Sequence, residues 1–127
     1  MRILGIDPGI ATIGFGVVDS DSRSHNLIKC GVITTPAHTS LSSRLEQIYD
    51  DMCGLLDMFK PDAVSIEELF FNTNITTGIS VAHGRGVILL ACRKAGVRIY
   101  EYTPLQVKQA VVGYGSCLLY TSPSPRD

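Results

Sequence analysis

Three short runs rich in apolar residues occupy the first 35 positions of the chain. Short glycine-rich or polar turns separate the runs, which is typical of strands joined as hairpins. We therefore predict strands over residues 2–6, 13–19 and 27–35, joined as an antiparallel meander. Pro36 ends the third strand.

Beyond Pro36 the apolar residues recur at steps of three and four, which is the period of an amphipathic helix. Thr39 or Ser40 can cap the start of this helix, and Pro61 lies just past its end. Its apolar face is expected to be core and consists of Leu41, Leu45, Ile48, Tyr49, Met52, Leu55, Leu56 and Phe59.

The second half alternates strands and helices, with strands at 63–66 and 97–100 and helices at 77–95 and 104–112. The helix before strand 63–66 implies a right-handed crossover, so this strand should pair in parallel with the first. We predict an α/β fold, a mixed five-stranded sheet with helices on its faces. A row of Gly78, Ala82 and Gly86 predicts close backbone packing of the second helix, against the sheet or a second subunit.

The composition fits a single globular domain. The 127 residues are 45% hydrophobic and 18% charged, which excludes a disordered chain. No signal peptide or apolar run long enough to span a bilayer is evident, so we expect a cytoplasmic protein. The four cysteines have no metal-site spacing and are expected to be free thiols.

Charge is unevenly distributed along the chain. Residues 1–80 carry ten acidic and five basic side chains, whereas residues 81–127 carry two acidic and six basic ones. This asymmetry is compatible with an anionic partner on the basic side, and a solvated helix face would give the same count.

Two acidic residues stand at the carboxyl ends of strands that should be neighbours. Asp7 ends the first strand before a Pro-Gly turn, and Glu67 ends strand 63–66. Two carboxylates on adjacent strands, about 4.8 Å apart, repel each other, and a hard cation such as Mg²⁺ relieves that repulsion. The pair therefore predicts a metal site, although Asp7 alone could equally be a turn residue. Alternation turns the adjacent Glu68 away, which makes it a poor third ligand.

Residues near this pair could contact nucleic acid. Phe70 follows the acidic pair on a predicted loop, where an exposed ring could stack on an unpaired base. Lys108, Arg85 and Arg93 could neutralise phosphates. Each of these signals is weak by itself, since adjacent phenylalanines usually include a core residue.

Five stretches taken together resemble the RuvC family, the Holliday junction resolvases of bacteria. They are residues 3–9 (ILGIDPG), 12–16 (TIGFG), 66–71 (IEELFF), 83–86 (HGRG) and 106–113 (QVKQAVVG). The resemblance covers residues 1–116 in order, and the set is far more specific than any one motif.

The resemblance implies an RNase H-like homodimer that nicks two strands of a four-way DNA junction, with two Mg²⁺ ions per site and Mn²⁺ able to substitute. It implies that Asp7 and Glu67 are catalytic metal ligands and that Phe70, Lys108 and Arg85 are DNA-binding residues. It also implies a dimer interface on the second helix and a branch-migration motor complex as a partner.

The sequence departs from the family pattern at its end. The family's other two catalytic positions lie in a C-terminal helix that has no counterpart here, so we expect this chain to lack nuclease activity. Residues 117–127 fit no element, and they back-translate to the transposon end and adapter of tagmentation sequencing libraries. We interpret 1–116 as an incomplete nuclease domain and 117–127 as adapter read-through; the alternative is a native Pro/Ser-rich tail.

Three other functions remain open from the residues alone. An RNase H-fold nuclease acting on RNA would share the first-strand aspartate and the metal chemistry. A non-catalytic junction-binding module would bind DNA independently of Mg²⁺. An actin-like ATPase domain also begins with a strand, an acidic residue and glycines, but it needs a much longer chain.

Overall fold

The computed structural model describes residues 1–68 and 75–102, and it contains five strands and two helices within those ranges. Their bounds are β1 (Arg2–Asp7), β2 (Thr12–Ser20), β3 (His25–Thr34), α1 (Leu41–Phe59), β4 (Ala63–Glu67), α2 (Ile75–Lys94) and β5 (Arg98–Tyr102). Each predicted strand and helix in these ranges is present. The helix predicted at 104–112 lies outside the described residues.

The five strands form one mixed sheet in the order β3-β2-β1-β4-β5. β1 pairs antiparallel with β2 and parallel with β4, and β4 pairs parallel with β5. The predicted meander, crossover and mixed sheet are therefore confirmed. The central place of β1 puts its last residue, Asp7, between β2 and β4 rather than at an edge.

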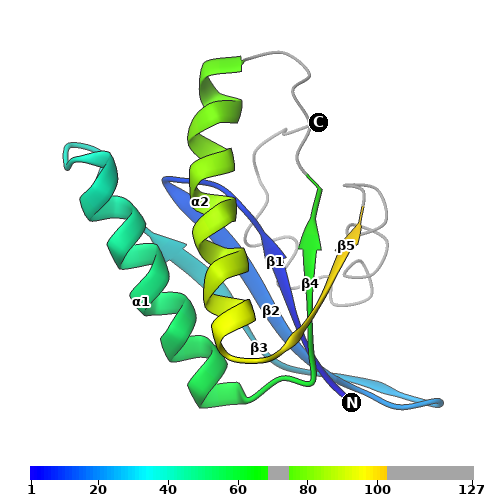
Figure 1. Ribbon diagram of the computed structural model, residues 1–127. Helices are drawn as coiled ribbons and strands as arrows, with labels where there is room; N and C mark the ends of the chain where they lie inside the picture. Colours follow the sequence, from blue (N-terminus) through cyan, green and yellow to red (C-terminus); the bar gives the residue numbers. More distant parts are fainter. Residues whose placement is uncertain (69–74, 103–127) are drawn as a thin grey trace.

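Both described helices cover the same face of the sheet (Figure 1). Leu4 and Ile6 of β1 point into this face together with Val64 and Ile66 of β4, and all four are at most 1% exposed. They pack against one buried stripe from each helix, comprising Ile48, Met52 and Leu56 of α1 and Ile88, Ala91 and Cys92 of α2. Burial of each such large side chain contributes about 1.5–3 kcal/mol, so this layer holds the helices on the sheet.

Local signals in the sequence set the ends of both helices. Ser40 caps α1, and its hydroxyl accepts a hydrogen bond from the Ser43 N–H at 3.2 Å. Lys60 ends α1 in the left-handed region, at φ 46°. Gly96, at φ 75°, ends α2 in a Schellman arrangement, with its N–H bonded to the Arg93 carbonyl and the Val97 N–H to that of Cys92.

The cysteines follow the expectation only in part. Cys53 and Cys92 are free thiols, and burial raises the pKa of the Cys92 thiol to about 11. Cys30 is disulfide-bonded, so the expectation of a free thiol was wrong for this residue. Spacing along the chain identifies local metal motifs but says nothing about contacts made across the fold.

Neither described helix is long and apolar enough to cross a membrane.

Candidate metal centre at the ends of β1 and β4

Asp7 and Glu67 end neighbouring parallel strands in the same register. Leu4 pairs with Val64, Gly5 with Ser65 and Ile6 with Ile66, and each carboxylate follows directly after the last pair. Side chains alternate along a strand, so both carboxylates project from the face opposite α1 and α2, because Ile6 and Ile66 are buried beneath the helices. Both residues are half-buried. The structure therefore brings the two predicted ligands together on one face.

The sheet beside Asp7 carries little side-chain volume. Gly14 pairs with Asp7 across β1 and β2, and Gly5 pairs with Gly16. A Cβ built on Gly14 would lie 3.7 Å from the Cβ of Asp7, and one on Gly16 would meet no described atom within 4 Å. As far as residues 1–68 and 75–102 are concerned, the backbone is thus open to a close approach on the face that bears the carboxylates.

The turn after Asp7 is held by hydrogen bonds from Thr35, the residue that follows β3, and α1 contacts Thr35 in turn. Thr35 donates its backbone N–H to the Ala11 carbonyl at 3.0 Å and its hydroxyl to the Ile10 carbonyl at 2.6 Å. Arg44 of α1 donates from Nε to the same hydroxyl oxygen at 2.9 Å. A Cβ on Gly9 would lie 2.3 Å from the Thr12 carbonyl oxygen, so this tight turn requires glycine there.

α2 contacts the same turn from the other side, through Gly84. A Cβ at Gly84 would lie 2.7 Å from the carbonyl oxygen of Gly9. The three small residues predicted to pack closely, Gly78, Ala82 and Gly86, differ in their burial. Gly78 is buried and Ala82 is half-buried, whereas Gly86 is exposed and a Cβ on it would meet no described atom within 4 Å. Close packing in the described chain thus depends on Gly84, which the four-residue spacing had not selected.

Arg85, the next residue, reaches the ends of β4 and β5. Its Nε donates to the Glu67 carbonyl oxygen at 3.1 Å, and its Nη2 forms an ion pair with the Glu101 carboxylate. The Arg85 side chain is only 14% exposed. The phosphate contact suggested for this residue stays a prediction, and the structure adds that its guanidinium is bonded to the protein beneath the candidate site.

Two tyrosines of β5 lie beside Glu67. Tyr102 pairs with Glu67 and Tyr100 with Ser65, so both rings project from the face that bears the carboxylates, and they are 36% and 43% exposed. The Tyr102 carbonyl accepts the Glu68 N–H at 2.6 Å. Sequence reasoning missed these residues, although a strand ending in two alternating tyrosines was a readable signal.

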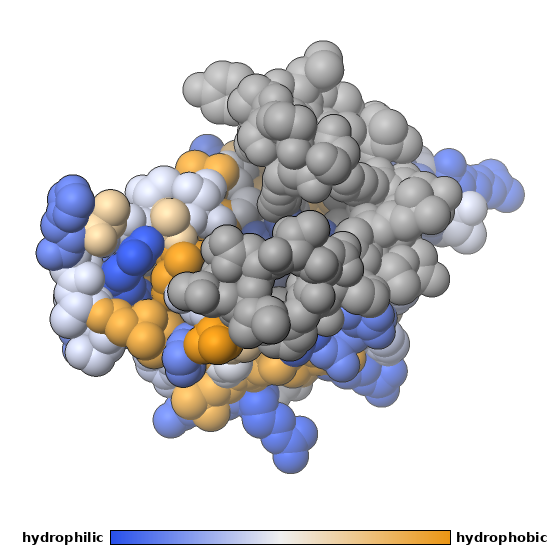
Figure 2. All heavy atoms as spheres, turned by 90° about the horizontal axis from the view of Figure 1, so that it is seen from above, coloured by the Kyte–Doolittle hydropathy of each residue, from blue (hydrophilic) through white to orange (hydrophobic). Residues whose placement is uncertain are grey.

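The remaining predicted site residues contribute less to this picture. Phe70 and Lys108 lie outside the described residues. Glu68 follows the end of β4 and is exposed, and alternation directs it away from the Glu67 face. Figure 2 shows the molecule from the end toward which β1 and β4 run. Among the coloured residues in this view, hydrophobic and hydrophilic side chains lie next to each other.

The two carboxylates fit a hard divalent cation. Mg²⁺ is held in proteins by one or two carboxylates together with waters and substrate oxygens. Within residues 1–68 and 75–102, no group of three or more His, Cys, Asp or Glu side chains gathers around one point. Asp7 and Glu67 are therefore the ligands that this part of the chain would supply, and further ligands would come from elsewhere.

The opposite end of the sheet carries a different, structural charge cluster. Arg2 at the start of β1 donates from Nε and Nη2 to the two Asp19 carboxylate oxygens at 2.8 and 3.0 Å, and from Nη1 to the Phe59 carbonyl at 3.0 Å. These hydrogen bonds lower the pKa of Asp19.

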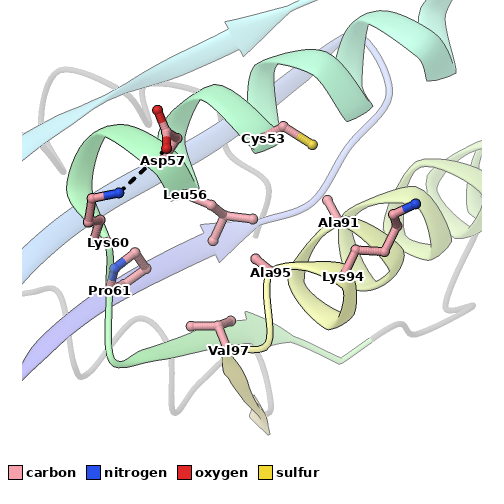
Figure 3. A pocket seen from close by; sticks show the side chains of 9 residues that line it. All are labelled: Cys53, Leu56, Asp57, Lys60, Pro61, Ala91, Lys94, Ala95 and Val97. Carbon is pink, nitrogen blue, oxygen red and sulfur yellow. Dashed lines mark hydrogen bonds and ion pairs between the residues drawn. The ribbon is translucent and has the colours of Figure 1, made fainter.

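A hollow of about 420 Å³ also lies at this end of the sheet, where Pro61 and Val97 lead into β4 and β5 (Figure 3).

Comparison with known proteins identifies the family of this chain. A sequence profile described as crossover junction endodeoxyribonuclease RuvC matches residues 3–118. The RuvC of Brevibacillus brevis is 55% identical over 115 residues, which are 91% of this chain and 69% of that protein. The RuvC of Ruminiclostridium cellulolyticum is 53% identical over the same shares of the two chains.

Solved structures give the same result. Thermus thermophilus RuvC in complex with a Holliday junction substrate has a TM-score of 0.80 and 32% identity, covering 98% of this chain and 84% of that one. The yeast mitochondrial Holliday junction resolvase Ydc2, at 17% identity and a TM-score of 0.64, shows the fold alone; 95% of this chain and 57% of that one are covered. The chain therefore belongs to the RuvC family of crossover junction endodeoxyribonucleases.

Proposed function

We propose that the protein represented by this chain resolves four-way DNA junctions by paired, Mg²⁺-dependent hydrolysis of phosphodiesters. The observation that carries the proposal is the register of Asp7 and Glu67, which follow the paired residues Ile6 and Ile66 on one open face of the sheet. Family membership and the junction bound to the Thermus thermophilus relative support the substrate class.

The chemistry assigned to this chain's residues is limited to metal binding. When bound, Mg²⁺ activates a water and stabilises the leaving oxygen of the phosphodiester. Asp7 and Glu67 would hold the cation, and mutual repulsion between the two carboxylates would be relieved by it. The glycines beside Asp7 leave room for a phosphate oxygen to approach the same point.

DNA contacts and assembly complete the proposal. Phe70 would stack on bases at the junction, and Lys108 would contact phosphates. Two copies would associate through the exposed side of α2, where Ile79 and Leu90 are 50% and 53% exposed. A branch-migration motor complex would act with the dimer in the cytoplasm, where bacterial chromosomal DNA lies.

Residues 117–127 are proposed to be adapter read-through rather than native sequence. The 127-residue chain would then lack two acidic ligands and would not cut junctions by itself. Sequencing the source DNA across the codons for Gly115 to Asp127 tests this directly. A frame that continues into a helix with two more acidic residues would support the proposal, whereas the same tail in the genome would contradict it.

Substrate class can be tested with a chimera that restores the missing part. Residues 1–116 would be joined to the C-terminal remainder of the Brevibacillus brevis relative, and the purified protein given a four-way junction, a linear duplex or a structured RNA. We expect Mg²⁺-dependent nicking of the junction and little cutting of the other two. Preferential RNA cleavage would establish the RNA nuclease instead, and junction binding unaffected by Mg²⁺ without nicking would establish a binding module.

A further inference from the structure

Arg85 connects three elements directly beneath the candidate metal site. It lies on α2, donates from Nε to the Glu67 carbonyl of β4, and pairs through Nη2 with Glu101 of β5. Glu101 is the register partner of Ile66, the residue before Glu67. The guanidinium therefore fixes the backbone of Glu67 itself, from the helix-covered side of the sheet.

The neighbouring residue of α2 supports the backbone behind the other carboxylate. A Cβ atom added to Gly84 would lie 2.7 Å from the carbonyl oxygen of Gly9, which is two residues after Asp7. Consecutive residues of one helix thus contact the chain just beyond Asp7 and at Glu67. Because both contacts come from α2, this helix can fix the distance between the ends of β1 and β4.

We propose that Arg85 is a positioning residue for the metal site, which sets the separation of the Asp7 and Glu67 carboxylates through the backbone. This inference rests on the proposed function, since it takes the two carboxylates as metal ligands. Mg²⁺ demands near-ideal octahedral geometry, so the backbone that carries its ligands has to be held closely in place. A tie at the Glu67 carbonyl holds that backbone before the cation arrives.

The charge of Arg85 makes this role distinguishable from an electrostatic one. Removing a cation near a divalent metal should by Coulomb's law strengthen metal binding. Removing a positioning contact should weaken it. The sign of the change in metal affinity therefore separates the two effects.

The experiment is a Mn²⁺ titration of the 127-residue chain, followed by electron paramagnetic resonance of the free ion. We expect Arg85→Met to weaken Mn²⁺ binding by about tenfold, the lower end of the effect of losing an outer-shell contact. Arg85→Lys keeps the charge and should fall between the parent and Arg85→Met. Arg93→Met, which removes an exposed charge from the same helix, should leave the affinity unchanged or slightly increase it.

Two further controls exclude trivial explanations. Leu56→Val destabilises the core on α1 and should lower the melting temperature without changing Mn²⁺ affinity. Junction binding in EDTA should be the same for parent and Arg85→Met, with the same salt dependence. Weaker metal-free binding with a reduced salt slope, together with unchanged Mn²⁺ affinity, would overturn the proposal in favour of a phosphate contact.

Amide hydrogen exchange provides a readout that does not need the metal. The Glu68 N–H is bonded to the Tyr102 carbonyl immediately after Glu67, and it should exchange at least tenfold faster in Arg85→Met. Unchanged exchange and unchanged Mn²⁺ affinity would overturn the proposal. If the parent binds no Mn²⁺, or Asp7→Asn leaves binding intact, the proposed metal function fails, and exchange at Glu68 alone decides whether Arg85 holds this backbone.

Discussion

α2 approaches the turn after Asp7 so closely at Gly84 that a Cβ atom added to this glycine would lie 2.7 Å from the carbonyl oxygen of Gly9, which is too close for a real Cβ atom. Gly84→Ala should therefore push α2 away from the turn that follows Asp7. The helix gains propensity from alanine, but the contact is with backbone and cannot be relieved by a rotamer change. We expect a net loss of about 1–3 kcal/mol in the free energy of unfolding, measured by urea denaturation.

Gly86 is the matched control two residues along the same helix. A Cβ there would meet nothing within 4 Å, so Gly86→Ala should raise the stability of α2 by up to about 1 kcal/mol. Equal stabilisation by both substitutions would show that Gly84 does not approach Gly9 as described.

The exposed side of α2 predicts the oligomeric state. Leu90 is 53% exposed, and we expect Leu90→Glu to convert a dimer to a monomer in sedimentation or gel filtration, because burying the introduced charge in an apolar interface is costly. Met58→Glu on α1 removes an apolar side chain that is 71% exposed and should leave the dimer intact. Dissociation by Met58→Glu alone would move the interface to α1.

The ion pair of Arg2 and Asp19 predicts a pH dependence of stability. The Arg2 hydrogen bonds lower the pKa of Asp19 in the folded chain, so the pair stabilises the fold above the unfolded pKa of about 4 and is lost as pH falls below it. Asp19→Asn should be less stable than the parent at pH 7, with the difference shrinking toward pH 3. Asp57→Asn, at an exposed pair, should show almost no difference at either pH, and a constant deficit for Asp19→Asn would contradict the assignment.

The left-handed conformation of Lys60 offers a stabilising substitution. Its φ of 46° is strained for a residue with a Cβ, and its ion pair with Asp57 is largely exposed, at 78% and 86%, and contributes little. Lys60→Gly should raise the free energy of unfolding by about 1 kcal/mol, whereas Lys60→Ala should give no gain. A stability of Lys60→Gly equal to that of Lys60→Ala would show that the backbone carries no such strain.

Much of the fold was readable from the sequence because its signals are local. The apolar period of α1, the cap at Ser40 and the Pro-Gly turn after β1 each act over a few residues, and the crossover rule then paired β1 with β4. The same reasoning brought Asp7 and Glu67 to one face. The direction of Glu68, away from that face, rests on the same alternation and stays a prediction.

The supporting contacts could not be read in the same way. The phosphate contact of Arg85 was inferred from its charge and stays a prediction, whereas its contacts with Glu67 and Glu101 cross three elements and have no local signal in the sequence. Gly84 was overlooked because the four-residue spacing selected the row of Gly78, Ala82 and Gly86, and Gly84 lies outside that row on the same helix. Both depend on how α2 is rotated against the strand ends, which is set by packing of the whole core.

The most direct test compares Glu67→Gln with Glu68→Gln in the chimera that carries residues 1–116 and the remainder of the Brevibacillus brevis relative. Both substitutions remove one carboxylate, at adjacent positions, but only Glu67 shares a face with Asp7. We expect Glu67→Gln to reduce the rate of Mg²⁺-dependent junction nicking by at least about 100-fold and Glu68→Gln to leave it within a few-fold of the parent. Equal effects of the two substitutions, or full activity of Glu67→Gln, would contradict the assignment of the metal site.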